Sequence, residues 1–383
     1  MGLATEVGAA TFDRTANTFQ LDLSTELAEI IRPDNTAFLD RVGSASMTAT
    51  QRIHYWTEDK LNPYTATAAA SLDASATSIA VATGQGARFV AGTLFKDKAI
   101  GKTEVIQVTG VSTDTLTIVR GYGSTTGETH ASLFEIQIIA HTKQEGWKPA
   151  QEDWTQERSS DYNRVQVFGM GITLARERQL VDQTVIASEI AHQSAYRLKE
   201  MSRQLDGSLI NGIRSAATES ATVYGSMGGL IEFVSATGGN TTTTTENLTE
   251  NVINTMVKDI WDDAGQINNG FILCGGALKR VIATFDQAYR RSDFNTRSVG
   301  FTVERFLSDL GYELEVIVDP WMPADVLVVG DMSKIKCGPL QGDAIKLEEL
   351  AKTGRTMEFM VSGGYTAEFR NALDCFAFHN NLS

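Results

Sequence analysis

Four carboxylates close together in an acidic, tryptophan-containing stretch are the residues best placed to do chemistry: Glu152, Asp153, Glu157 and Asp161. Two carboxylates held roughly 5 to 9 Å apart can act as acid and base in hydrolysis. Nothing in the spacing shows that these four converge, and Arg158 and Arg164 lie nearby as counterions. The stretch therefore predicts a solvated or intersubunit charged strand, and an α/β hydrolase using Asp161 is the alternative from another class.

Other catalytic motifs are incomplete. Gly101-Lys102-Thr103 matches the end of a phosphate-binding loop, but position 96 is a lysine where that loop needs a glycine. Glu189 and His192 are three apart on a predicted helix, where any two exposed side chains meet by geometry. The five histidines show no metal-ligand spacing: His54, His130, His141, His192 and His379. We therefore predict no catalytic residue, cofactor or metal site, and no enzyme.

Composition also excludes several classes. The formal charge is −14 and no run of five basic residues occurs, which argues against a specific grip on nucleic acid. The acidity suits a container wall, which would repel packed DNA and contact it only non-specifically, but many soluble enzymes are equally acidic. Cys274, Cys337 and Cys375 are far apart, so reduced, buried thiols are expected. No signal peptide or 18-residue apolar run is present, which predicts a protein made and used in a cytoplasm.

The carboxylates belong to a predicted two-stranded loop, formed by residues 46–63 and 143–172. Residues 48–62 alternate like a strand, and 147–174 return with polar spacing. A two-stranded ribbon is marginally stable in water and needs a partner surface. The predicted intersubunit contacts are therefore Arg52, Tyr55, Trp56, Trp147, Trp154, Arg158 and Arg164. The alternative for the aromatic residues is a local core.

Two further regions flank this loop. Residues 1–45 are acidic and poor in large apolar side chains, which predicts an extended arm with one short helix at 22–31. Residues 64–142 predict a small all-β insertion domain with strands at 79–81, 89–95, 105–111, 116–119 and 134–139.

Helical periodicity then extends from Ala175 to about Ala216. Such a helix would be about 60 Å long at 1.5 Å per residue. Its apolar stripe contains small residues, which favours a spine lying across a sheet over a dimeric coiled coil.

The remaining chain predicts alternating strands and helices. A glycine turn at 225–230 precedes a helix that ends at Gly265, a buried strand at 271–274 and a helix at 277–285. Two strands, 313–318 and 326–329, flank a Pro-Trp-Met-Pro turn. The final segment, 356–378, predicts paired strands around Gly363-Gly364.

The order of these elements, with the passage GYELEVIVDPWMPADVLVVGDMSKI, resembles a tailed-bacteriophage major capsid protein of the Hong Kong 97 fold, in particular the SU-ten-like family. The resemblance covers nearly the whole chain except 64–142. It implies an α+β fold with an N-terminal arm, an extended loop, a spine helix, axial and peripheral domains, and the insertion at the loop tip. The implied boundaries are 1–45 for the arm, 46–63 with 143–172 for the loop, 64–142 for the insertion, 173–221 for the spine helix and peripheral domain, 222–340 for the axial domain, and 341–383 for the peripheral C-terminal strands.

The resemblance also implies a function and partners. Many copies would form pentamers and hexamers of an icosahedral shell that encloses double-stranded DNA, giving a virion capsid assembled in the host cytoplasm. The expected partners are sister copies, a portal and a decoration protein, and a separate scaffolding protein because no long helical prefix precedes the arm. The alternative within the same fold is an encapsulin-like bacterial compartment that carries cargo enzymes.

Overall fold

The computed structural model describes residues 36–146, 158–176, 188–215, 223–285, 305–351 and 354–382. The chain forms two compact units, Met1–Trp56 with Ser160–Ser383, and Thr57–Ser159. The described residues contain helices as well as several sheets, which confirms the predicted α+β class. The predicted arm helix at 22–31 and residues 147–157 of the predicted loop lie outside the described residues.

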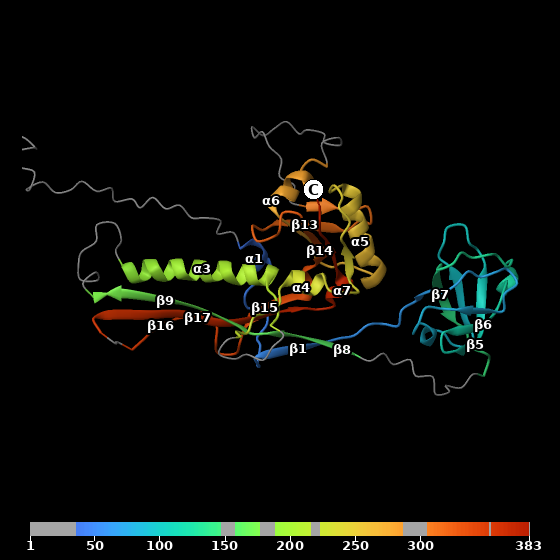
Figure 1. Ribbon diagram of the computed structural model, residues 1–383, viewed down its shortest axis with the longest axis horizontal. Helices are drawn as coiled ribbons and strands as arrows, with labels where there is room; N and C mark the ends of the chain where they lie inside the picture. Colours follow the sequence, from blue (N-terminus) through green and yellow to red (C-terminus); the bar gives the residue numbers. More distant parts are fainter. Residues whose placement is uncertain are drawn as a thin grey trace, which may run out of the picture. The chain divides into compact units, whose positions relative to one another are not determined.

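A long helix on a four-stranded sheet forms one part of the first unit (Figure 1). The central strand β17 pairs antiparallel with each of the other three strands. The elements are β9 (Gln166–Ala175), α3 (Glu189–Asn211), β15 (Ile335–Pro339), β16 (Lys346–Glu349) and β17 (Thr356–Phe369). Alternate residues of β9, Phe168, Ile172 and Leu174, are buried in one core with Met201 and Leu205 of α3. The period of two in β9 and the apolar stripe of α3 therefore meet face to face.

The predicted single helix from Ala175 to Ala216 is too long. Residues 177–187 and Ala216 lie outside the described residues, Ser188 is extended, and α3 has 23 residues, about 35 Å at 1.5 Å each. Ser188 caps the helix by accepting a hydrogen bond from the Ala191 N–H. The chain turns away at Gly212, where a side chain would lie 2.3 Å from the Ser208 carbonyl oxygen.

The prediction of two paired strands around Gly363-Gly364 is wrong. Strand β17 runs through both glycines without interruption. A β-carbon at Gly363 would lie 2.8 Å from the Ile345 backbone nitrogen, and one at Gly364 would lie 2.8 Å from the Asp343 carboxylate. The glycines therefore allow the 343–345 segment to approach the strand closely.

A six-stranded mixed sheet forms the second part of the first unit, in the order β10-β18-β14-β11-β13-β12. The strands are β10 (Asn240–Thr242), β11 (Gly270–Cys274), β12 (Arg305–Leu307), β13 (Glu313–Val318), β14 (Leu327–Asp331) and β18 (Phe376–His379). Strand β11 is parallel to β13 and antiparallel to β14, so the two strands around the Pro-Trp-Met-Pro turn do not pair with each other. Because β18 pairs with β14, the predicted boundary at residue 341 does not coincide with the division between the two sheets.

The helices of this unit agree with the local sequence signals in most places. They are α1 (Ala37–Val42), α4 (Leu230–Val234), α5 (Glu250–Ala264), α6 (Gly276–Ile282) and α7 (Ala372–Cys375). Helix α5 ends at Gly265, whose positive φ of 79° suits glycine, as predicted. The three cysteines are buried thiols, and burial raises the pKa of Cys274 to about 11 and that of Cys337 to about 12. Among the described residues no helix combines the length and apolar character needed to cross a membrane.

Strands β1 (Ile53–Glu58) and β8 (Ser159–Arg164) pair only with each other among the described strands. This confirms the predicted pairing of the outgoing and returning strands, each of which is six residues long. The chain then leaves the ribbon at Val165 and continues as β9 of the four-stranded sheet. We refer to the β1–β8 pair as the ribbon.

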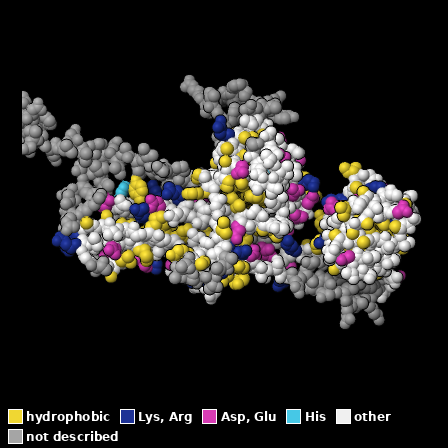
Figure 2. Space-filling view, in the orientation of Figure 1, with side chains coloured by type: hydrophobic (Ala, Val, Ile, Leu, Met, Phe, Trp, Pro, Cys, Tyr) yellow, Lys and Arg dark blue, Asp and Glu magenta, His cyan; other side chains and the backbone are white. Residues whose placement is uncertain are grey.

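The second unit contains a six-stranded antiparallel sheet with the order β2-β7-β4-β5-β6-β3. Its strands are β2 (Thr65–Thr67), β3 (Ser78–Ala80), β4 (Thr93–Asp97), β5 (Val105–Ser112), β6 (Thr115–Val119) and β7 (Glu135–His141). A bridge between Ala68 and Val81 joins the two ends of this order, so the sheet closes into a small barrel. On the face that Figure 2 shows, apolar side chains of the barrel are scattered and do not gather in one patch.

The barrel has its own core of buried side chains, which includes Phe95, Ile106, Val108, Leu116 and Ile136. Predicted strands at 105–111 and 116–119 are present. The strand predicted to start at Phe89 begins later, at Thr93, because residues 86–88 form a turn of 3₁₀ helix. The prediction missed β2, whose three residues carry too short an alternation to show in the sequence.

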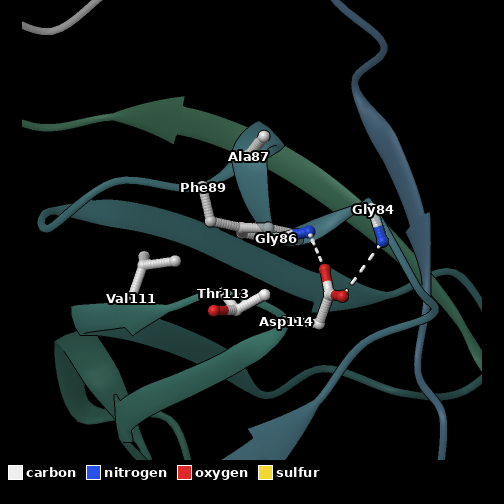
Figure 3. Close-up of a pocket in the computed structure, with 7 residues that line it drawn as sticks. All are labelled: Gly84, Gly86, Ala87, Phe89, Val111, Thr113 and Asp114. Atoms are coloured by element: carbon white, nitrogen blue, oxygen red, sulfur yellow. Dashed lines mark hydrogen bonds between the residues drawn. The ribbon is translucent and has the colours of Figure 1, made fainter.

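A cavity of about 340 Å³ opens beside this turn. Figure 3 shows the Asp114 side chain directed toward Gly84 and Gly86, whose N–H groups each donate to its carboxylate at 3.0 Å. These two bonds lower the pKa of Asp114. The carboxylate therefore fixes the loop between β3 and β4 to the turn before β6.

Candidate intersubunit surface

Five of the seven predicted contact residues lie in the described residues, all on or next to the ribbon. Trp147 and Trp154 lie outside them. Arg52 is exposed, and its carbonyl oxygen accepts a hydrogen bond from the Val165 N–H at 2.9 Å.

Trp56 is a core residue of its own chain and not a surface contact. Its side chain is 5% exposed, and its ring centroid lies 5.8 Å from that of Phe233. Phe233 in turn packs on Phe369 at 5.2 Å. For Trp56 the alternative of a local core is therefore correct, and the prediction of an intersubunit contact is wrong.

Tyr55 lies on the opposite face of the same strand, because successive side chains of a strand alternate. It is 63% exposed, and its ring centroid is 5.4 Å from that of Tyr162 on β8. The two tyrosines form an aromatic pair across the ribbon, which presents apolar area and hydroxyl groups to the outside.

The two arginines differ in their environments. Arg158 is well exposed and lies 3.3 Å from the equally exposed Asp59 carboxylate, a kind of pair that contributes about 0 to 1 kcal/mol. Arg164 is half-buried, and its Nε is buried with no hydrogen-bond partner among the described residues. A buried donor without an acceptor is energetically unfavourable.

Asn163 anchors the ribbon to the first unit. Its buried side chain donates to the Gly228 and Ala367 carbonyl oxygens at 3.0 and 2.9 Å, and accepts from the Gly228 N–H at 2.8 Å. One side chain thereby joins β8, the glycine turn and β17. Sequence reasoning missed Asn163, since its partners are 65 and 204 residues away.

Arg214 holds the ribbon from a second direction. It donates to the Asp161 carboxylate at 2.8 Å and to the Tyr162 carbonyl oxygen at 2.5 Å. Its guanidinium also lies 4.3 Å from the Tyr162 ring centroid and 5.1 Å from that of Phe233. Asp161 is therefore paired with Arg214, and not with Arg158 or Arg164 as the sequence suggested.

Glu368 on β17 is the third anchor. Burial alone would raise the pKa of this carboxyl, but hydrogen bonds from His54 on β1 and from Arg370 outweigh burial and lower it. His54 Nε2 lies 2.5 Å from Glu368 Oε1, and Arg370 Nε lies 2.7 Å from Oε2. A buried carboxylate held by a histidine and an arginine thus ties the inner face of the ribbon to the sheet.

The residues considered for catalysis have structural partners. Asp161 faces a cation, and Glu152, Asp153 and Glu157 lie outside the described residues. Glu189 accepts from Gln193, while His192 lies edge-on to Tyr196 with centroids 4.5 Å apart. Lys102 donates to the Thr129 carbonyl oxygen in the barrel. Over the described ranges no group of three or more His, Cys, Asp or Glu side chains is arranged so that it could hold a metal ion.

A buried charge cluster lies inside the barrel, made of Asp97, Glu104, Arg120 and His130. His130 lies between Asp97 and Glu104, at 2.8 and 3.1 Å, and Arg120 binds both oxygens of Glu104. Burial would raise the pKa of Glu104, but bonds from Arg120, His130 and two backbone N–H groups outweigh it and lower the pKa to about 2. The histidine and both carboxylates are shielded from solvent, so the cluster stabilises the barrel and offers no access to a substrate.

Comparison with known proteins identifies the family. The sequence model of the family described as SU10 major capsid protein matches residues 8–382. No curated protein matches the chain. The capsid asymmetric unit of cyanophage A-1(L) is similar at 11% identity with a TM-score of 0.57, over 97% of this chain and 99% of that chain. The capsid of an empty GTA particle is similar at 10% identity with a TM-score of 0.53, over 98% and 100% of the two chains.

At such low identity the solved structures show the fold alone, and that fold is the Hong Kong 97 type predicted from the order of elements. The family itself is identified by the sequence match, since that match extends over almost all of the chain. The chain belongs to the SU10 major capsid protein family.

Proposed function

We propose that copies of this phage major capsid protein assemble through the ribbon into hexamers and pentamers of an icosahedral shell around double-stranded DNA. Its family supports the role as a shell subunit. The observation that carries the proposed contact is the asymmetry of the ribbon. Trp56 and His54 fix its inner face to the chain's own core, while Tyr55, Tyr162 and Arg158 lie on the side away from it or at its end.

The edges of the ribbon support the same proposal. Among the described strands each ribbon strand pairs with one neighbour, so each has one edge at which a strand of another chain could add. A neighbouring copy would lie along this edge and cover the tyrosine pair.

Further partners follow from the function of a shell. We propose a scaffolding protein that directs curvature, a portal at one vertex, and assembly in the host cytoplasm. The barrel of the second unit has its own core and is proposed to contact a decoration protein. The described catalytic candidates all have structural partners, which supports a role without enzyme activity. The family match favours the phage shell over the bacterial compartment.

Assembly of a double variant tests the ribbon contact. Tyr55→Ala with Arg158→Glu should leave the folded subunit intact, because both side chains are exposed, but should reduce shells to at most about a tenth of the wild-type yield. Electron microscopy and sedimentation of protein co-expressed with the neighbouring phage genes would measure this. Tyr64→Ala, an exposed tyrosine of the barrel, is the matched control. Normal shell yield from the double variant would refute the ribbon contact.

A further inference from the structure

Two carboxyl groups are buried beside α1, the first described helix of the chain. Asp206 lies on α3 and Asp319 directly follows β13, and neither side chain is exposed to solvent. Helix α1 lies against both, with Phe38 and Leu39 in the same core.

Three of the four carboxyl oxygens accept a backbone N–H. The Leu39 N–H donates to Asp206 Oδ1 at 2.9 Å, the Phe38 N–H to Asp319 Oδ2 at 3.4 Å, and the Trp321 N–H to Asp319 Oδ1 at 2.9 Å. The fourth oxygen, Asp206 Oδ2, is buried and has no partner among the described residues. Since Phe38 and Leu39 are consecutive, their N–H groups bring the two carboxyls together.

The charges around Asp206 and Asp319 do not offset the cost of burying two acidic groups together. Burial, and then the neighbouring Asp319, raise the pKa of Asp206 to about 8; Asp40 on α1 acts in the same direction and the Leu39 N–H opposes it. The adjacent cation on α1, Arg41, contacts Glu315 on β13. Two carboxylates this close in a dry environment do not both ionise, so the pair holds one proton at neutral pH.

We infer that Asp206 carries this proton on Oδ2 and donates it to Asp319, and that loss of the proton loosens α1 from α3 and from the segment after β13. The hydrogen bonds decide which carboxyl is protonated. Both oxygens of Asp319 already accept N–H groups, whereas Asp206 Oδ2 is left without a donor or acceptor unless it carries hydrogen.

A cavity of about 290 Å³ opens beside α1 and α3 and reaches the residue before Asp206, with neither aspartate in its lining. Its lining includes Leu39 of α1, together with Ser202 and Leu205 on the α3 turn that leads to Asp206. Helix α1 also keeps apolar contacts, such as the Phe38 ring 6.0 Å from that of Phe271. Deprotonation therefore weakens the attachment of α1 without abolishing it, and makes the packing of this first described helix sensitive to protons.

The direction of the pH dependence follows from linkage. When α1 is packed against the pair, Asp206 has a raised pKa of about 8. When α1 detaches and water enters, the pKa returns toward its ordinary value of 3.8. The stabilisation from this proton is complete below about pH 4, falls as the pH rises, and has been lost above about pH 8. Within this window the opening constant of α1 increases up to about tenfold per pH unit.

Hydrogen–deuterium exchange of the α1 peptide in the full chain tests the inference, from pH 5 to 9.5 with correction for intrinsic exchange. In the wild type, protection should fall to about pH 8 and then level off. Asp206→Asn mimics the protonated acid, since its amide can donate to Asp319, and should remove the pH dependence and raise protection at pH 8 by at least about tenfold. Asp319→Asn places an amide N–H₂ against a backbone donor and should lower protection at every pH.

Asp309→Asn, which removes an exposed carboxylate, is the control and should keep the wild-type profile. Constant protection in the wild type, an unchanged profile in Asp206→Asn, or equal behaviour of the two variants would each overturn the assignment. Infrared spectroscopy of the wild type needs no variant. It should show the band of a buried protonated carboxyl group at pH 7 that disappears above pH 8, and the absence of this band at pH 7 would contradict the inference.

Discussion

The two buried carboxylate clusters of this chain have opposite electrostatic designs. In the barrel, Glu104 is fully buried yet bound by Arg120, His130 and backbone N–H groups, which hold its pKa at about 2. In the first unit Asp206 is equally buried but faces another carboxyl, and its pKa rises to about 8. Burial is common to both, so the partner determines whether a buried acid locks a fold or makes it responsive to pH.

The comparison predicts its largest effect for the arginine of the barrel. Arg120→Met removes the cation while leaving Glu104 buried, which should destabilise the barrel by about 3 to 5 kcal/mol. Exchange rates of β5 amides in the full chain would report this loss. Lys98→Ala breaks an exposed ion pair with Glu135 and should change stability by less than about 1 kcal/mol. Equal effects of the two variants would show that the buried cluster has no special role.

The second-largest effect is expected from acid, to which the two clusters should respond in opposite directions. The pKa of Glu104 is lowered from 4.5 to about 2, so its stabilisation is present above pH 4.5 and is lost as the pH falls toward 2. At about 1.4 kcal/mol per pH unit, the barrel should lose at most about 3 kcal/mol over this range. The same β5 amides, measured between pH 5 and 2.5, would detect it. Glu104→Gln should be less stable at pH 6 and lack this contribution to the acid response; a wild-type acid response in this variant would rule out Glu104 as its source.

The smallest effect is expected from a charge at the rim of the first cluster. Asp40 is exposed and raises the pKa of Asp206 only as the last of its causes. Asp40→Asn should move the pH at which α1 protection levels off downward by less than about one unit, because exposed charges are screened. A larger shift would mean that Asp40 belongs to the buried pair itself.

Sequence predicted the elements whose signals are local. The apolar run at Phe271–Cys274, the stop at Gly265 and the alternation before Trp56 each lie within a few residues, and each element is present. The start of α3 was missed because small and branched residues around Ala175 satisfy helical and strand spacing alike. Gly363-Gly364 resembled a turn because the same dipeptide serves turns and close backbone approach.

The anchoring residues could not be predicted because their partners are distant in sequence. Asp206 accepts from Leu39 across 167 residues, and Asn163 reaches Ala367 across 204. Trp56 was placed on the surface because an aromatic residue in a ribbon suits either face until the register is known. Tyr55, one position earlier, is exposed, and its intersubunit contact stays a prediction.

The bridge between Ala68 and Val81 affects how barrels of neighbouring copies behave when they are crowded together. Flanking bonds from Ala69 to Ala80 and from Ala82 to Thr67, both 2.8 Å, complete the circle of strands. A sheet without open ends cannot recruit a strand from its twin, which is the usual route from dense packing to fibrils. Copies of the barrel that shell assembly brings close together therefore remain separate folded bodies.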